Sequence, residues 1–192
     1  MTAVGSVDTR LVVLRGDSGS GKTTTATALR PLLRAKTAVI HQDHFRRTLL
    51  AGGEKNSRSA DAAALIDTVA RQSLDLGYDV ILDGVFNLRD YAGRLEQLWR
   101  DHRGVTRIYQ FDVGFEETVR RHETRELRNA FTPEEMRAWH DGWQPLEFVE
   151  EGRIGPEETL PEILARIVAD LREGSSSAVA DSRRPKDRFA DS

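Results

Sequence analysis

The sequence predicts an α/β protein in which a parallel five-stranded sheet lies between two layers of helices. Short apolar runs, each about as long as one strand, alternate with longer helical patterns along the chain. A glycine-rich segment joins the first apolar run directly to the first helical pattern. Strand–helix alternation is typical of a parallel sheet covered on both faces, and a length of 192 residues suits one domain.

The first 76 residues contain two predicted strands and three predicted helices. Leu11–Leu14 and Thr37–His41 are short apolar runs typical of buried strands. A Thr- and Ala-rich helix is predicted from Lys22, and a second helical stretch runs from Asp43 to about residue 50. Residues 60–76 repeat apolar side chains on one helical face, which predicts a longer amphipathic helix.

The rest of the chain continues the alternation and ends in a polar segment. The predicted strands are 80–82, 105–111 and 146–149, and the predicted helices are 91–102, one from about 115, one from 132 and 161–171. From Gly174 the chain is poor in apolar residues and rich in Ser, Asp and Arg, which predicts a disordered tail. We therefore expect one domain over residues 1–173 and a tail over 174–192.

Composition excludes several classes of function. The chain has a formal net charge of −3 and no cysteine, so disulfides, thiol catalysis and cysteine-based zinc sites are excluded. Proteins that hold long nucleic acids are usually basic, so the charge favours a small substrate over a nucleic acid. No apolar run approaches the roughly 20 residues of a membrane helix. The N-terminus does not match a secretory signal, and we expect a cytoplasmic protein without membrane contact.

The strongest motif is a phosphate-binding loop after the first strand. Its residues match the pattern G-x-x-x-x-G-K-[ST] at every fixed position: Gly16, Asp17, Ser18, Gly19, Ser20, Gly21, Lys22 and Thr23. In such loops the backbone N–H groups and the N-terminus of the next helix bind phosphate oxygens. Lys22 would neutralise the β- and γ-phosphates, and the Thr23 hydroxyl would bind Mg²⁺. We expect this loop, together with Thr24, to bind ATP with Mg²⁺.

A candidate catalytic carboxylate follows the second strand. Asp43 would face the γ-phosphate from the end of that strand and could accept a proton from an attacking hydroxyl. Arg46 and Arg47 follow at helical spacing and could bind an anionic group of the acceptor. The alternative is that Asp43 only caps the helix that begins there.

A second carboxylate ends the third strand. The apolar run 80–82 leads to Asp83, the position at which a Walker B carboxylate reaches Mg²⁺ directly or through water. Asp83 would thus lie beside the substrate, and Asn87 could orient it. The alternative is an ordinary turn, because Asp-Gly sequences favour turns.

A basic stretch over residues 120–128 is the candidate lid. Arg121 and Arg125 lie four residues apart, hence on one helical face. On a movable segment they would close over the triphosphate, stabilise the transferring phosphoryl group and exclude water. The alternative is a solvated helix with Glu–Arg pairs.

The order of these motifs resembles that of the small P-loop kinases related to phage polynucleotide kinase (the AAA_33 group), to zeta-type toxins and to chloramphenicol phosphotransferase. The similarity covers roughly residues 10–145 and is closest in Gln42–Arg46 and Val119–Arg125. The resemblance implies a three-layer αβα P-loop NTPase fold with strand order 2-3-1-4-5 and a helical lid over about 120–133.

The same resemblance implies roles for single residues. Asp43 would be the general base, Arg46 would contact a phosphate of the acceptor, and Arg121 and Arg125 would engage ATP. The expected function is therefore ATP-dependent phosphorylation of a hydroxyl on a small molecule, such as an antibiotic or a nucleoside-like metabolite. A polynucleotide 5′-hydroxyl kinase and a nucleotide-switched regulatory protein remain alternatives. We expect a monomer or a homodimer.

Overall fold

A computed structural model of the chain describes residues 3–51, 55–123, 132–138 and 140–182. The elements follow one another as β1 (Arg10–Gly16), α1 (Lys22–Leu29), η1 (Arg30–Leu32), β2 (Thr37–His41), η2 (His44–Leu49), α2 (Lys55–Asp75), β3 (Asp79–Asp83), α3 (Leu88–Asp101), β4 (Val105–Phe111), α4 (Phe115–Glu123), α5 (Pro133–Ala138), β5 (Gly152–Ile154) and α6 (Leu160–Ser182). Strands and helices alternate over most of the chain, as the sequence pattern predicts.

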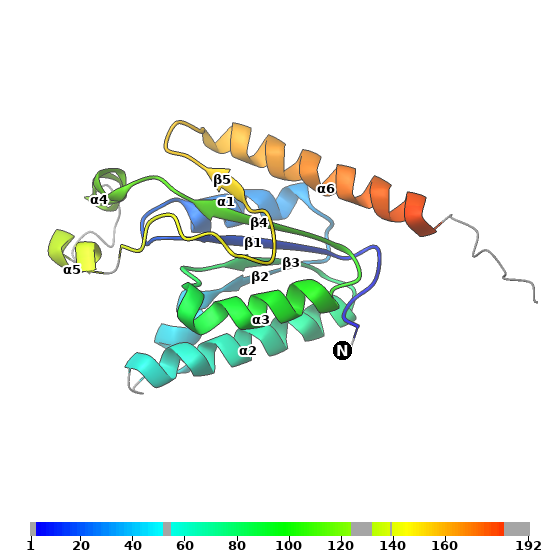
Figure 1. Cartoon of the computed structure of the whole chain (residues 1–192), viewed down its shortest axis with the longest axis horizontal. Helices are drawn as coiled ribbons and strands as arrows, with labels where there is room; N and C mark the ends of the chain where they lie inside the picture. The colour runs from blue at the N-terminus through cyan, green and yellow to red at the C-terminus, as the bar shows by residue number, and fades with distance from the viewer. Residues whose placement is uncertain (1–2, 52–54, 124–131, 139, 183–192) are drawn as a thin grey trace, which may run out of the picture.

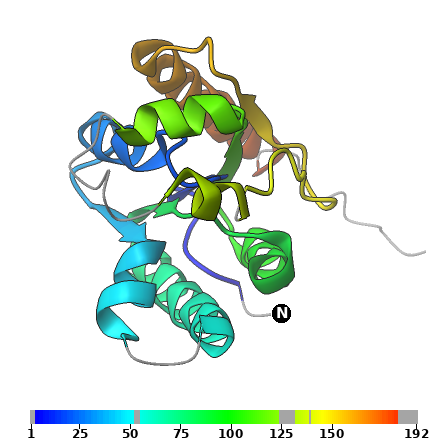
Figure 2. The same cartoon turned by 90° about the vertical axis from the view of Figure 1, so that its left-hand side faces the viewer.

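The five strands form one parallel sheet in the order β2-β3-β1-β4-β5. This confirms both the predicted fold class and the predicted order 2-3-1-4-5. Helices α2 and α3 cover one face of the sheet, and α1 and α6 cover the other (Figure 1). Seen end-on in Figure 2, α5 lies in front of the strand ends, and α4 lies in front of the layer that contains α1 and α6.

Alternate residues of the central strand, β1, pack against the two helical layers. Leu11 and Val13 belong to the apolar cluster under α2 and α3, whereas Val12 and Leu14 belong to the cluster under α1 and α6. All four side chains are almost completely buried. A strand buried on both faces reads as a continuous apolar run, which is why its position was visible in the sequence.

The fifth strand was predicted in the wrong place. The structure has it at Gly152–Ile154, where it pairs with the end of β4, and not at 146–149. Leu146 is buried in the cluster under α2 and α3, and the ring of Phe148 lies 5.6 Å from that of Trp99. The apolar residues of 146–149 therefore pack as a loop on the α3 side of the sheet, where they need no strand pairing.

The final helix is longer than predicted. Helix α6 continues to Ser182, past Gly174, at which a disordered tail was expected to begin; residues 183–192 lie outside the described part. Gly174 lies against β4: a Cβ atom there would come within 2.7 Å of Arg107 Nη2 and 2.8 Å of Val105 Cγ1. This glycine therefore permits a close approach of helix and sheet rather than ending the helix.

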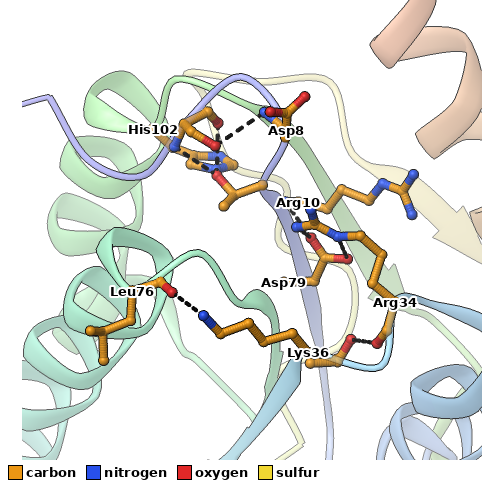
Figure 3. A network of polar contacts seen from close by, with 10 residues as sticks. Asp8, Arg10, Arg34, Lys36, Leu76, Asp79 and His102 are labelled. Atoms are coloured by element: carbon orange, nitrogen blue, oxygen red, sulfur yellow. Dashed lines mark hydrogen bonds and ion pairs between the residues drawn. The ribbon is translucent and has the colours of Figure 1, made fainter.

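A polar network joins the elements at the end of the sheet where the strands begin (Figure 3). The fully buried Asp79 accepts hydrogen bonds from the Arg10 backbone N–H and from Arg34 Nε, both at 2.9 Å. The imidazole of His102 is buried nearby, with Nε2 3.0 Å from Thr9 Oγ1 and Nδ1 2.8 Å from Thr106 Oγ1. These contacts lie at the end of the sheet where the strands begin, and the phosphate-binding loop lies at the other end.

Burial lowers the pKa of the His102 imidazole from 6.5 to about 4. Between these values the unfolded chain binds a proton that the folded chain does not, so stability falls as the pH drops through this window. We expect His102 to contribute a loss of about 3 kcal/mol of unfolding free energy between pH 7 and pH 4. Urea unfolding at several pH values should show that the free energy of unfolding depends less steeply on pH in H102Q than in the wild type. The exposed His44 provides the control, and equal slopes for H102Q and H44Q would contradict the prediction.

Candidate active site

A cavity of about 470 Å³ opens at the ends of β1, β2 and β3. Its walls come from the phosphate-binding loop, the residues after β2 and the residues after β3. They are Ser18, Gly19, Gly21, Lys22, Thr23, Thr24, His41, Gln42, Asp43, Arg47, Asp83, Gly84 and Val85. Ligands of open parallel sheets bind beyond the carboxyl ends of the strands, and the cavity lies at this position.

The ammonium group of Lys22 is held inside its own loop. It donates to the backbone carbonyl of Asp17 at 2.7 Å and to Ser20 Oγ at 3.1 Å, and the residue is only 6% exposed. Gly21, with a left-handed backbone at φ 110°, leads from the loop into α1. The loop thus presents a buried positive charge and a helix N-terminus on the same side, an arrangement suited to an anionic ligand.

Thr23 and Asp83 both line the cavity and contact each other. The Thr23 hydroxyl donates to Asp83 Oδ2 at 2.7 Å, although 60 residues separate them in the sequence. Hard cations such as Mg²⁺ prefer oxygen ligands and usually retain waters and phosphate oxygens as further ligands. The hydroxyl of Thr23 and the carboxylate of Asp83, beside the phosphate-binding loop, are oxygen donors of the kind that such an ion takes.

His41 also contacts Asp83, which the sequence did not predict. His41 Nδ1 lies 2.8 Å from Asp83 Oδ2, the same oxygen that the Thr23 hydroxyl contacts. The two residues are direct neighbours in the register of β2 and β3. The strand order together with the register would have revealed this pair, but neither can be derived from local sequence patterns.

Asp43 lines the cavity from the segment that follows β2. Its side chain is 64% exposed and makes no capping hydrogen bond to η2, so the cap-only alternative has no support in the structure. Arg47 Nε lies 3.3 Å from Asp43 Oδ1 and also lines the cavity. The segment after Asp43 is a π-helix, a rare geometry that is frequent at functional sites. Arg46 is half-buried and is not among the residues lining the cavity.

Two residues of the predicted site have side chains that point away from the cavity. The carboxylate of Asp17 accepts backbone hydrogen bonds from Asp141 and Gly142 on the far side of the loop. Asn87 Oδ1 accepts a hydrogen bond from the Asp90 backbone at 2.9 Å and thereby caps α3. Neither residue lines the cavity, because each is engaged by backbone donors that would otherwise lack a partner.

The predicted lid is only partly described. Arg121 lies in α4, and its side chain is not described; Arg125 lies outside the described residues. The neighbouring Arg120 is exposed and pairs with Glu117 at 2.7 Å. For Arg120, therefore, the structure shows the solvated Glu–Arg pair that was the alternative for this stretch.

These features define a protein with the P-loop α/β fold. The fold is similar to those of three solved kinases. APS kinase CysC from Mycobacterium tuberculosis, solved with AMPPNP and APS, matches with a TM-score of 0.68 and 20% identity over 88% of this chain and 99% of that one. A gluconokinase from Sinorhizobium meliloti gives a TM-score of 0.66 and 17% identity over 95% of this chain and 100% of that one. A sugar kinase from Janibacter sp. HTCC2649 gives a TM-score of 0.59 and 18% identity over 88% of this chain and 98% of that one.

The chain belongs to the AAA_33 family, described as an AAA domain, whose pattern matches residues 11–146. The matched range begins in β1 and ends after α5, so it contains the whole cavity. No curated protein matches the sequence. Within the described residues, no helix is long and apolar enough to cross a membrane.

Proposed function

We propose that this protein transfers the γ-phosphoryl group of ATP to a hydroxyl group of a small molecule. The observation that carries the proposal is the shared cavity: Lys22 and Thr23 line it from one side and Asp43 from another. Its volume of about 470 Å³ lies within the range usual for small-molecule sites. The similarity in fold to kinases of small molecules supports the same reaction class.

The phosphate side of the cavity would bind and stabilise the triphosphate. Lys22 would exchange its contact with the Asp17 carbonyl for the β- and γ-phosphate oxygens as the nucleotide binds. Thr23 and Asp83 would hold Mg²⁺, which neutralises charge on those oxygens. Arg121 and Arg125 are proposed to add positive charge from the lid.

The acceptor side would supply the general base. The acceptor oxygen forms a bond to the γ-phosphorus while the bond from that phosphorus to the β–γ bridging oxygen breaks, and ADP leaves. Asp43 takes the proton of the acceptor hydroxyl. Arg47, which contacts Asp43 in the absence of an acceptor, would turn to an anionic group of the acceptor, and Arg46 would support it.

The two alternative functions make different demands on the molecule. A polynucleotide 5′-hydroxyl kinase would use the same base and loop but would need a basic track for the strand, and the net charge of −3 does not favour one. A nucleotide-switched regulatory protein would need no acceptor. The presence of an exposed carboxylate on the cavity wall favours an acceptor.

Measuring ATP consumption with and without candidate acceptors tests the proposal. Stimulation by small hydroxyl compounds that carry a carboxylate, sulfate or phosphate supports it, and mass spectrometry should then find the phosphorylated product. Stimulation by a 5′-hydroxyl oligonucleotide alone would establish the polynucleotide alternative. ATP turnover that responds only to a protein partner would establish the regulatory one.

The Lys22→Ala substitution should lower kcat/KM for ATP by about 10²- to 10³-fold with any acceptor, because a preorganised charge on the transferring group is lost. Steady-state kinetics with circular dichroism as a folding check would measure this. Lys36→Ala is the matched control: Lys36 contacts the Leu76 carbonyl, and both residues belong to the network at the opposite edge of the sheet (Figure 3). Equal activity of the two variants would refute the role of Lys22.

A further inference from the structure

The side chain of Asp17 turns away from the cavity, although the residue belongs to the phosphate-binding loop. A carboxylate facing the nucleotide would repel its phosphates. Instead, Asp17 Oδ1 accepts from the Asp141 N–H and Oδ2 accepts from the Gly142 N–H, each at 3.0 Å. His140 Nδ1 lies 2.9 Å from Oδ2. Asp17 is only 8% exposed, so these contacts are shielded from water.

The three partners of the Asp17 carboxylate belong to the segment that follows α5. We call residues 140–144 the return segment, because here the chain comes back from α5 to the sheet. Two further buried side chains hold it: Gln110 Nε2 donates to the Gly142 carbonyl at 2.8 Å, and Arg15 Nη1 donates to the Gln144 carbonyl at 2.9 Å. The return segment is therefore fastened to the ends of β1 and β4 and to the phosphate-binding loop.

Helix α4, which leads away from the sheet after β4, packs against the phosphate-binding loop. Gly19 faces the backbone of α4 so closely that a Cβ atom there would lie 2.9 Å from the Thr118 carbonyl oxygen. At the start of α4, the Phe115 ring packs edge-on against His140 with centroids 5.5 Å apart. The guanidinium of Arg137, in α5, lies 4.1 Å from the centroid of the same Phe115 ring. Both the outgoing helix and the return segment thus contact residues Asp17–Gly19.

The backbone of Asp17 completes the connection to the nucleotide site. Without nucleotide its carbonyl accepts the hydrogen bond from Lys22 Nζ, and a bound triphosphate would replace the carbonyl as the partner of Lys22. We infer that Asp17 is a positioning residue that couples occupation of the phosphate-binding loop to the placement of the return segment and hence of α5. A bound phosphate orders the loop, and the ordered loop holds its carboxylate firmly against the N–H groups of Asp141 and Gly142. The role in catalysis rests on the function proposed above, whereas the coupling itself does not.

Hydrogen exchange of the Asp141 and Gly142 amides tests the coupling without any acceptor. In the wild-type protein, Mg²⁺ with AMPPNP should slow exchange of both amides. In Asp17→Ala the two amides should exchange about tenfold faster in the free protein, since each has lost a buried acceptor, and AMPPNP should no longer protect them. Asp17→Asn keeps one acceptor oxygen and should restore part of the protection. Asp112→Ala, which removes a carboxylate that pairs with the exposed Arg153, is the matched control.

Measurements of AMPPNP binding and of kcat distinguish a positioning role of Asp17 from repulsion between its carboxylate and the phosphates. We expect the AMPPNP dissociation constant of Asp17→Ala to stay within about threefold of the wild type, while kcat falls about tenfold. Unchanged exchange at Asp141 and Gly142 in Asp17→Ala, or protection by AMPPNP that survives the substitution, would overturn the inference. If no acceptor is phosphorylated by the wild-type protein, the kinase proposal fails, and the exchange experiment still decides the coupling.

Discussion

Replacing Asp43 with asparagine is expected to lower kcat for phosphoryl transfer by about 10²- to 10⁴-fold, the usual contribution of a general base. The amide has the shape of the carboxylate but cannot accept the proton of the acceptor hydroxyl. Nucleotide binding should persist, because Asp43 belongs to the residues after β2 and not to the phosphate-binding loop. Steady-state kinetics with an acceptor, together with titration of AMPPNP by calorimetry, would separate the two effects.

The matched control is Asp8→Asn, which neutralises an exposed carboxylate near the opposite edge of the sheet (Figure 3). Asp43 is itself exposed, so its substitution should leave the free energy of unfolding within about 0.5 kcal/mol of the wild type. A fully active Asp43→Asn enzyme would eliminate the base assignment. The cavity would then retain a nucleotide site but no identified group to activate an acceptor.

The second large effect concerns stability. Arg15 and Glu151 form an ion pair at 2.8 Å with side chains that are 3% and 0% exposed. Glu151 also accepts from the Leu146 N–H at 2.7 Å. Glu151→Leu leaves a buried guanidinium without its counter-charge, and we expect it to lower the free energy of unfolding by about 3–5 kcal/mol. Urea unfolding followed by circular dichroism would measure the loss.

A double substitution tests the cause. Arg15→Met combined with Glu151→Leu removes both charges, and it should recover much of the lost stability, because apolar replacements of buried ion pairs are often nearly neutral. Glu96→Leu provides the surface control, since its pair with Arg100 is exposed and such pairs contribute about 0.5 kcal/mol. A loss in Glu151→Leu no larger than that in Glu96→Leu would show that the buried pair is not needed for stability.

The prediction of the candidate site from the sequence was uneven for a physical reason. Lys22, Thr23 and Asp83 follow from contiguous patterns, a glycine-rich loop and a strand ending in a carboxylate, and all three line the cavity. Asp17 and Asn87 lie within the same contiguous patterns, yet their side chains accept hydrogen bonds from backbone N–H groups. A loop pattern defines where the backbone passes but does not determine which donors surround each side chain.

The order of motifs and the spacing of apolar residues determined the class of fold, the phosphate-binding loop and the position of Asp43 at a strand end. These properties depend on short-range periodicity and on local loop geometry, which neighbouring residues specify. Only the tertiary structure decided the contact of His41 with Asp83, the position of β5 and the attachment of the return segment to Asp17. Each of these depends on groups brought together from distant parts of the chain, where packing and buried hydrogen bonds select the partners.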